Sequence, residues 1–325
     1  MKKKPLLLYY SILKFQRESL ALLGEHFDLC ERETPAADTG TELAEAVVTF
    51  APLGFQCGKE KIDRMPLLRV IASNTTGEPH IDVVYARSKG ISVATLKGES
   101  VFLDSITPTA EHTFGLLLAL MRHIPSAFEF VKTGRWDRRP FGGSAMLSRL
   151  SIGIIGLGRL GSMVAQYARA FRMRPIYYFD PFVESGESSL VRCATLAELV
   201  SRSDVVTVHV PHEPETAGMI NRDVFQAMKP GAYFINTARG ELVDFSALRA
   251  VLESGRLAGA ALDVFEGEFE PGFAERLPGH PLLAWARVHD NLLLTPHIGG
   301  STIDAWRETE LFTIRKIIRT LEAKR

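Results

Sequence analysis

Short apolar runs alternate with helical patterns along almost the whole chain. In the N-terminal part, helical patterns such as Arg17–Gly24 and Ile81–Gly90 lie between such runs. The runs are Leu6–Tyr10, Phe27–Cys30, Val47–Phe50, Leu68–Ala72 and Ile91–Thr95. This alternation is typical of parallel α/β sheets, so the pattern predicts a small doubly wound domain.

A second alternating series begins at Ser151. Its predicted strands are Ser151–Ile155, Pro175–Phe179, Val205–Val210, Ala232–Asn236, Gly259–Asp263 and Asn291–Thr295. Helices fit between most of them, for example at Ser246–Ser254. A long helix is expected from Thr107, and a last helix at Thr302–Ala323 is expected to return to the first domain. We therefore expect an α/β protein of two doubly wound parallel-sheet domains, residues 1–104 with 300–325 and residues 105–299.

Composition narrows the class of protein. The 325 residues suffice for two cores, and 38 basic residues balance 38 acidic ones, which leaves no basic field for nucleic acid. The three cysteines lie far apart and outside any CxxC, which favours a reducing compartment and disfavours a thiolate metal site. The apolar run at Leu6–Leu13 is too short for a membrane span and fits a strand better than a leader. We expect a cytoplasmic protein without bound metal or membrane.

The strand Ser151–Ile155 runs into a glycine turn of the form G-x-G-x-x-G. Gly156 permits the turn, Gly158 lets backbone N–H groups approach a pyrophosphate, and Gly161 lets the next helix pack on the sheet. Asp180 follows the next strand, 19 residues beyond Gly161. Its carboxylate suits the ribose hydroxyls of NAD and repels the 2′-phosphate of NADP. The second domain is therefore predicted to be a Rossmann domain that binds NAD.

Three further segments follow strands of the second series, where open α/β sheets place ligands. They carry Arg239, a cluster of glutamates at 266, 268 and 270, and His297. Arginine can clamp a carboxylate, histidine can exchange a proton near neutrality, and a carboxylate can orient the imidazole. Spacing alone does not separate Glu268 from Glu266 and Glu270.

Read together, these motifs resemble the D-isomer-specific 2-hydroxyacid dehydrogenase family over nearly the whole chain. The matching segments are 156–161, 236–240, 263–268 and 296–300. The resemblance implies that Arg239 binds the substrate carboxylate, that Glu268 is the partner of the histidine, and that His297 is the acid/base. It also implies that the turn Asn74, Thr75, Thr76 and Gly77 donates backbone hydrogen bonds to the substrate carboxylate.

The same resemblance implies a larger set of cofactor contacts. Arg159 and Leu160 present backbone N–H groups to the pyrophosphate, Val210, Pro211 and Thr216 line the adenine side, and Asp263 with Thr237 and Ala238 holds the carboxamide. The complete predicted cofactor set is Gly156, Gly158, Arg159, Leu160, Gly161, Asp180, Val210, Pro211, Thr216, Thr237, Ala238, Arg239, Asp263, His297, Gly299 and Gly300. The implied activity is reversible hydride transfer between NAD and a small D-2-hydroxy acid or its 2-oxo acid.

Two departures from the family pattern bear on the site. Phe269 stands where the family usually has proline after the catalytic glutamate, and the stretch from Glu268 to His297 is 29 positions, longer than expected. The additional loop also leaves Glu266 open as an alternative to Glu268.

Other functions remain open from the sequence. A phosphoglycerate dehydrogenase-like activity, without a regulatory domain, needs a cation for the phosphate, for which Lys97 is the candidate. An NAD-sensing, corepressor-like binding protein with little turnover is the alternative from another class. A homodimer built on the long helix after Thr107 is expected, from the resemblance and from the apolar face of this helix.

Overall fold

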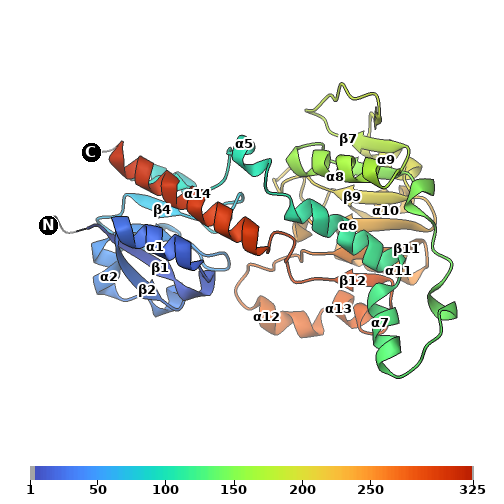
Figure 1. Ribbon diagram of the computed structural model, residues 1–325, viewed down its shortest axis with the longest axis horizontal. Helices are drawn as coiled ribbons and strands as arrows, with labels where there is room; N and C mark the ends of the chain where they lie inside the picture. Colours follow the sequence, from blue (N-terminus) through green and yellow to red (C-terminus); the bar gives the residue numbers. More distant parts are fainter. Residues whose placement is uncertain (1–3, 324–325) are drawn as a thin grey trace. The chain divides into compact units, whose positions relative to one another are not determined.

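The computed structural model describes residues 4–323 and divides into two compact units. Unit 1 comprises the described residues up to Ile106 together with those from Ser301 onward, and unit 2 runs from Thr107 to Gly300. The outermost ends of the predicted first domain, residues 1–3 and 324–325, lie outside the described residues. Each unit is a parallel sheet with helices on both faces (Figure 1), so the predicted fold class is confirmed.

Unit 1 holds a five-stranded parallel sheet in the order β2-β1-β3-β4-β5. The strands are β1 (Leu6–Tyr10), β2 (Asp28–Arg32), β3 (Ala46–Phe50), β4 (Val70–Ala72) and β5 (Ser92–Ala94). Strand order reverses at β1 and β3, which is where a doubly wound sheet opens a crevice at its carboxyl edge. The loops that follow β3, β4 and β5 therefore share one edge of the sheet.

The helices of unit 1 cover the two faces of this sheet. Leu8 and Tyr10 face the core under α2 (Gly40–Glu45), α3 (Lys59–Asp63) and α4 (Val83–Ser88). Leu7 and Tyr9 face the other core, under α1 (Arg17–His26) and α14 (Ile303–Glu322). Figure 1 shows α14 beside α1 along this face, so the last helix completes the fold of the N-terminal residues. A short helix, α5 (Ser100–Leu103), follows β5.

Unit 2 holds a seven-stranded parallel sheet in the order β12-β11-β10-β9-β6-β7-β8. The strands are β6 (Ile152–Ile155), β7 (Ile176–Phe179), β8 (Leu190–Arg192), β9 (Val205–Val208), β10 (Ala232–Asn236), β11 (Leu257–Leu262) and β12 (Leu292–Leu294). All six predicted strands of this series are present, and strand order reverses between β6 and β9. The segments after β6, β9, β10, β11 and β12 therefore meet at one carboxyl edge.

Two layers of helices enclose the sheet of unit 2. One face packs against α6 (Pro108–Met121) and α8 (Arg159–Ala170), which lie side by side in Figure 1. The other face packs against α9 (Leu196–Arg202), α10 (Arg222–Ala227), α11 (Phe245–Glu253) and α13 (Pro281–Ala286). Two further helices are α7 (Ile124–Lys132) and α12 (Phe273–Arg276).

Three local features differ from the sequence-based expectations. Strand β8 is unpredicted because it is short and mostly exposed, so it lacks an apolar signal. The helix from Thr107 ends at Met121, and His123 has a left-handed backbone (φ 52°) before α7 begins in a new direction. The expected loop between Glu268 and His297 contains α12 and α13, where the His280 ring accepts the Leu282 N–H and caps α13.

Candidate active site

The glycine turn joins β6 to α8 at the carboxyl edge of unit 2. Gly156 has φ +88°, and a Cβ there would come within 2.7 Å of Val210 Cγ1. A Cβ on Gly161 would lie 2.0 Å from the Gly156 carbonyl oxygen, so the helix can approach the turn only because this residue lacks one. Around Gly158 no atom lies within 4 Å of an added Cβ, which leaves open space at the N-terminus of α8. This open turn at a helix N-terminus fits a pyrophosphate group.

Asp180, directly after β7, is tied to the same turn. Its Oδ2 accepts the Leu157 N–H at 2.8 Å, and its Oδ1 accepts the N–H groups of Phe182 and Val183 at 2.8 and 3.0 Å. A carboxylate has about four acceptor positions, which is one more than these three N–H groups use. The residue is 9% exposed, which limits access to a group that enters over the turn.

The segment after β9 forms the neighbouring wall of the turn. Thr216 Oγ1 donates to the Pro211 carbonyl at 2.7 Å and accepts the Glu213 N–H at 2.9 Å, which fixes the loop that follows Val210. Burial lowers the pKa of His209, at the end of this strand, to about 4. His209 therefore stays neutral near pH 7, and its Nε2 lies 2.9 Å from the Thr207 hydroxyl.

The loop after β10 presents Arg239. Asn236 braces this loop, because its Oδ1 accepts the Ala238 N–H at 2.9 Å and its Nδ2 donates to the Arg239 carbonyl at 2.8 Å. The Arg239 guanidinium donates to the Ala238 carbonyl at 2.6 Å. None of the ion pairs among residues 4–323 involves Arg239, so its positive charge is available to an anionic ligand.

His297 follows β12 and is held by a glutamate. Its Nδ1 lies 2.8 Å from Glu268 Oε1, with the two side chains 31% and 11% exposed. The ring of Phe269 packs against the imidazole with centroids 5.5 Å apart. The carboxylate accepts the Nδ1 proton, which leaves Nε2 as the nitrogen that can exchange a proton with a ligand.

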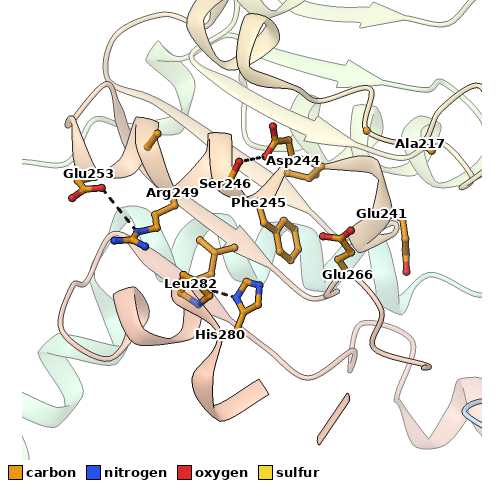
Figure 2. Close-up of a pocket in the computed structure, with 14 residues that line it drawn as sticks. Ala217, Glu241, Asp244, Phe245, Ser246, Arg249, Glu253, Glu266, His280 and Leu282 are labelled. Carbon is orange, nitrogen blue, oxygen red and sulfur yellow. Dashed lines mark hydrogen bonds and ion pairs between the residues drawn. The ribbon is translucent and has the colours of Figure 1, made fainter. Parts of the chain in front are cut away.

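The other two glutamates of this segment face elsewhere. Glu270 pairs with Arg276 at 3.0 Å. Glu266 lines a hollow of about 830 Å³ between α11 and α13, together with Glu241, Asp244, Arg249 and His280 (Figure 2). None of the predicted site residues lines this hollow. The geometry thus separates the three carboxylates and brings only Glu268 to His297.

The carboxylate of Asp263, after β11, accepts hydrogen bonds from the surrounding turn. Oδ1 accepts the Thr295 hydroxyl at 2.6 Å and the Ile298 N–H at 2.9 Å, and Oδ2 accepts the Gly299 N–H at 2.7 Å. His112 of α6 lies 3.2 Å from Oδ1. The sequence identified His112 only as part of a helix, because nothing in its own neighbourhood indicates that α6 passes these strand ends.

In unit 1 the turn Asn74–Gly77 follows β4. Thr75 fixes it by donating from Oγ1 to the Gly77 carbonyl at 2.7 Å and by accepting the Leu96 N–H at its own carbonyl. In the described chain no hydrogen bond uses the backbone N–H groups of residues 74–77. Such a run of unused N–H groups at a sheet edge suits an anion.

Lys97, the candidate phosphate ligand, lies on the loop after β5 and is 3.4 Å from Glu78 Oε2. Glu78 also accepts the Thr95 hydroxyl at 2.7 Å, and its side chain is only 11% exposed. The charge of Lys97 is therefore balanced by a carboxylate adjacent to the turn.

Among residues 4–323, no group of three or more His, Cys, Asp or Glu side chains is placed to hold a metal ion. No single helix of this part of the chain is long and apolar enough to cross a membrane, and α6 and α7 reach that length only when joined across a 58° bend.

The chain is similar in sequence to a known family model and to known dehydrogenases and reductases. The family model for the "D-isomer specific 2-hydroxyacid dehydrogenase, NAD binding domain" matches residues 114–299. A glyoxylate reductase from Thermofilum pendens is 37% identical over 270 residues, which cover 82% of this chain and 75% of the relative. A D-3-phosphoglycerate dehydrogenase from Bacillus subtilis is 38% identical over 249 residues, 76% of this chain. That alignment spans 44% of the Bacillus protein, so the chain matches less than half of its length.

The fold is shared with solved structures over nearly the whole chain. A crystal structure of D-lactate dehydrogenase from Aquifex aeolicus, complexed with NAD and lactic acid, superposes with a TM-score of 0.80. It is 29% identical in sequence, and the match covers 98% of this chain and 96% of the other.

Proposed function

Because the chain belongs to the D-isomer-specific 2-hydroxyacid dehydrogenase family, we propose that it transfers a hydride reversibly between NAD and a small D-2-hydroxy acid or its 2-oxo acid. The observation that carries this proposal is the 2.8 Å contact between His297 Nδ1 and Glu268 Oε1, on the sheet edge that also presents Arg239. Acid, base and carboxylate-binding groups on one edge are the set that carbonyl reduction needs.

The nucleotide fits the opposite part of the same edge. The open turn at Gly158 would hold the pyrophosphate, the remaining acceptor of Asp180 would take a ribose hydroxyl, and the backbone at Thr237 and Ala238 would hold the carboxamide. When bound, the nicotinamide supplies the hydride that a protein side chain does not. The negative charge of Asp180 favours NAD over NADP, so Asp180→Ala should reduce the ratio of kcat/KM with NADH to that with NADPH. An unchanged ratio would count against this cofactor preference.

The two remaining tasks, proton transfer and binding of the substrate carboxylate, fall to His297 and Arg239. Since Glu268 occupies the Nδ1 side, proton transfer to the substrate oxygen takes place from His297 Nε2. Arg239, which has no acidic partner in the described chain, binds the substrate carboxylate and stabilises the charge that develops on the neighbouring oxygen.

From the family resemblance we also propose that the turn Asn74–Gly77 of unit 1 offers backbone donors to an acid substrate. Lys97 forms an ion pair with Glu78, so its charge is already balanced by a carboxylate. This pairing favours a small substrate acid with one negative charge over a phosphorylated acid. We therefore retain the small 2-hydroxy acid as the substrate class and do not extend the proposal to 3-phosphoglycerate.

The proposal includes a homodimer, but the apolar residues of α6 on which the sequence-based expectation rested are buried in the core of unit 2. Helix α7 leaves Ile124, Phe128 and Val131 between 43% and 63% exposed, and Trp136 beyond it is 90% exposed. A second copy of this chain is the occupant we expect on this apolar surface. Sedimentation that shows only monomer would contradict it. We place the enzyme in the cytoplasm, since all three cysteines are unpaired thiols.

Activity is tested by NADH oxidation against glyoxylate, hydroxypyruvate, pyruvate, a branched 2-oxo acid and phosphohydroxypyruvate. We expect turnover with at least one unphosphorylated acid and none with the His297→Ala variant. Tight NADH binding without reduction of any acid would instead favour an NAD-sensing binding protein.

A further inference from the structure

One face of α6 contacts all three loops that carry the proposed chemistry. Thr109, His112 and Thr113 are three and four residues apart, so they project from the same side of the helix. Thr113 Oγ1 lies 2.9 Å from Thr237 Oγ1 in the loop of Arg239, and His112 contacts Asp263 and Thr295. Thr109 and His112 also pack near Gly299, within 3.5 Å of where its Cβ would stand.

The direction of the hydrogen bonds at His112 can be worked out from its neighbours. The single hydroxyl proton of Thr295 goes to Asp263 Oδ1 at 2.6 Å, so Thr295 offers His112 only a lone pair. His112 Nε2 lies 3.1 Å from that oxygen and 3.2 Å from Asp263 Oδ1, and both of these atoms are acceptors. Nε2 must therefore carry a proton and donate it, whether the ring is neutral or charged.

Asp263, which accepts this proton, also forms hydrogen bonds with the segment that carries His297. Its carboxylate accepts the N–H groups of Ile298 and Gly299, and its backbone carbonyl accepts the His297 N–H at 2.8 Å. His297 itself has a left-handed backbone with φ 53°, a conformation that costs a non-glycine residue on the order of 1–3 kcal/mol. The hydrogen bonds that Asp263 accepts therefore help to hold residues 297–299 in this conformation, together with the bond from the His297 N–H to the Thr295 carbonyl at 3.0 Å.

The Asp263 carboxylate is almost completely buried, at 1% exposure. Burial raises its pKa, but hydrogen bonds from His112, Thr295, Ile298 and Gly299 outweigh this effect and leave the pKa below its ordinary value. His112 is the largest of these opposing contributions.

We propose that His112 is a positioning residue for proton transfer: its Nε2–H fixes the Asp263 carboxylate, which holds residues 297–299 so that His297 stays against Glu268. The inference rests on the proposed function, because it assigns His112 a part in the same reaction. A histidine that only filled space under α6 would need no donor at Nε2, and an apolar side chain of similar size would replace it.

Two substitutions separate positioning from packing. His112→Leu fills the space without a donor, whereas His112→Gln places an amide N–H about where Nε2 stands. We expect kcat for 2-oxo acid reduction to fall about tenfold in His112→Leu and to recover to within about threefold in His112→Gln. The dissociation constant of NADH should change less than kcat in both, since the glycine turn is unaltered and the predicted contact of Asp263 with the carboxamide is one among many nucleotide contacts.

A spectroscopic readout makes the test independent of turnover. The His297 Nδ1 proton bound to Glu268 should give a downfield NMR signal, identified among nine histidines by its loss in His297→Gln. We expect this signal in the wild type and His112→Gln, and its shift or loss in His112→Leu. His26→Leu, at the exposed end of α1, is the control for a histidine-to-leucine change and should behave as wild type.

The outcomes separate the two proposals. An unchanged His297 signal and kcat in His112→Leu, or equal losses in both His112 variants, would overturn the positioning role. A wild-type enzyme that reduces none of the 2-oxo acids would overturn the proposed function, while the NMR comparison would still decide whether His112 positions His297.

Discussion

The carboxyl edges of the two sheets are built in different ways. The edge of unit 2 carries side chains with distinct chemical tasks: an arginine without an acidic partner in the described chain, and a histidine held by Glu268. The edge of unit 1 offers backbone N–H groups at Asn74–Gly77, and its lysines are paired, Lys97 with Glu78 and Lys316 with Glu99. Under the proposed function, unit 2 would perform the chemistry and unit 1 would select the acid by shape and charge.

The largest effect is expected at His297, the proposed proton donor at the carboxyl edge of unit 2. Replacing His297 by alanine removes the proton donor and leaves the glycine turn untouched, so turnover should fall by at least about a thousandfold. NADH binding, measured by fluorescence titration, should survive. Loss of both NADH binding and turnover would show that His297 supports the nucleotide site. Nucleotide binding and proton transfer would then not be separate tasks of different residues at this edge.

The glycines of unit 2 offer a matched pair that separates binding from folding. An alanine Cβ at Gly158 meets no atom within 4 Å, whereas at Gly161 it would lie 2.0 Å from the Gly156 carbonyl. Gly158→Ala should therefore weaken NADH binding at least about tenfold with an unchanged melting temperature, because the Cβ enters the space proposed for the pyrophosphate. Gly161→Ala should lower the melting temperature itself. Equal NADH affinity in Gly158→Ala and wild type would remove the pyrophosphate from this turn.

Selection by unit 1 can be tested at Glu78, whose side chain is 11% exposed. Glu78→Gln keeps the size of the side chain and the Thr95 contact but removes the charge that balances Lys97. We expect the ratio of kcat/KM for phosphohydroxypyruvate to that for hydroxypyruvate to rise about tenfold. Glu99→Gln, which affects the pair with Lys316, is the control. The same ratio in Glu78→Gln as in wild type would mean that this ion pair takes no part in selecting the substrate.

The two edges also differ in how far the sequence predicts them. In unit 2, Gly156, Gly161 and Asp180 each meet a local requirement of the turn, so the motif and its spacing predicted their placement. The six apolar runs of this unit all form strands because buried parallel strands need continuous hydrophobic residues.

What the sequence left open depends on contacts between distant residues. The choice among Glu266, Glu268 and Glu270 is made by the path of the chain after β11, which turns Glu266 to the hollow beside α11 and Glu270 to Arg276. The approach of His112 to Asp263 crosses 151 positions of sequence and has no local signal. The pairing of Lys97 with Glu78 likewise joins loops after two different strands.

The smallest effect is expected from an ion pair on the edge strand β2 of unit 1, which does not neighbour β3, β4 or β5 in the sheet. Arg32 Nη2 donates to Glu42 Oε2 at 2.6 Å, and this contact, opposed by burial and aided by Thr39, lowers the pKa of Glu42 to about 2. Since the pKa is depressed on folding, the pair stabilises the protein above the ordinary carboxyl pKa of about 4.5, and this stability is lost as the pH falls toward 2.

Glu42→Gln should therefore reduce stability by about 1 kcal/mol at pH 7, since Arg32 is partly exposed, and the difference from wild type should shrink as the pH falls from about 5 to 3. Thermal unfolding across this range measures it, with Glu60→Gln on α3 as the control. Because this pair serves stability and the Glu78 pair is proposed to serve selection, Glu42→Gln should leave the preference among 2-oxo acids unchanged. A changed preference would mean that charge anywhere in unit 1, and not charge on the loops after β4 and β5, sets which acid is reduced.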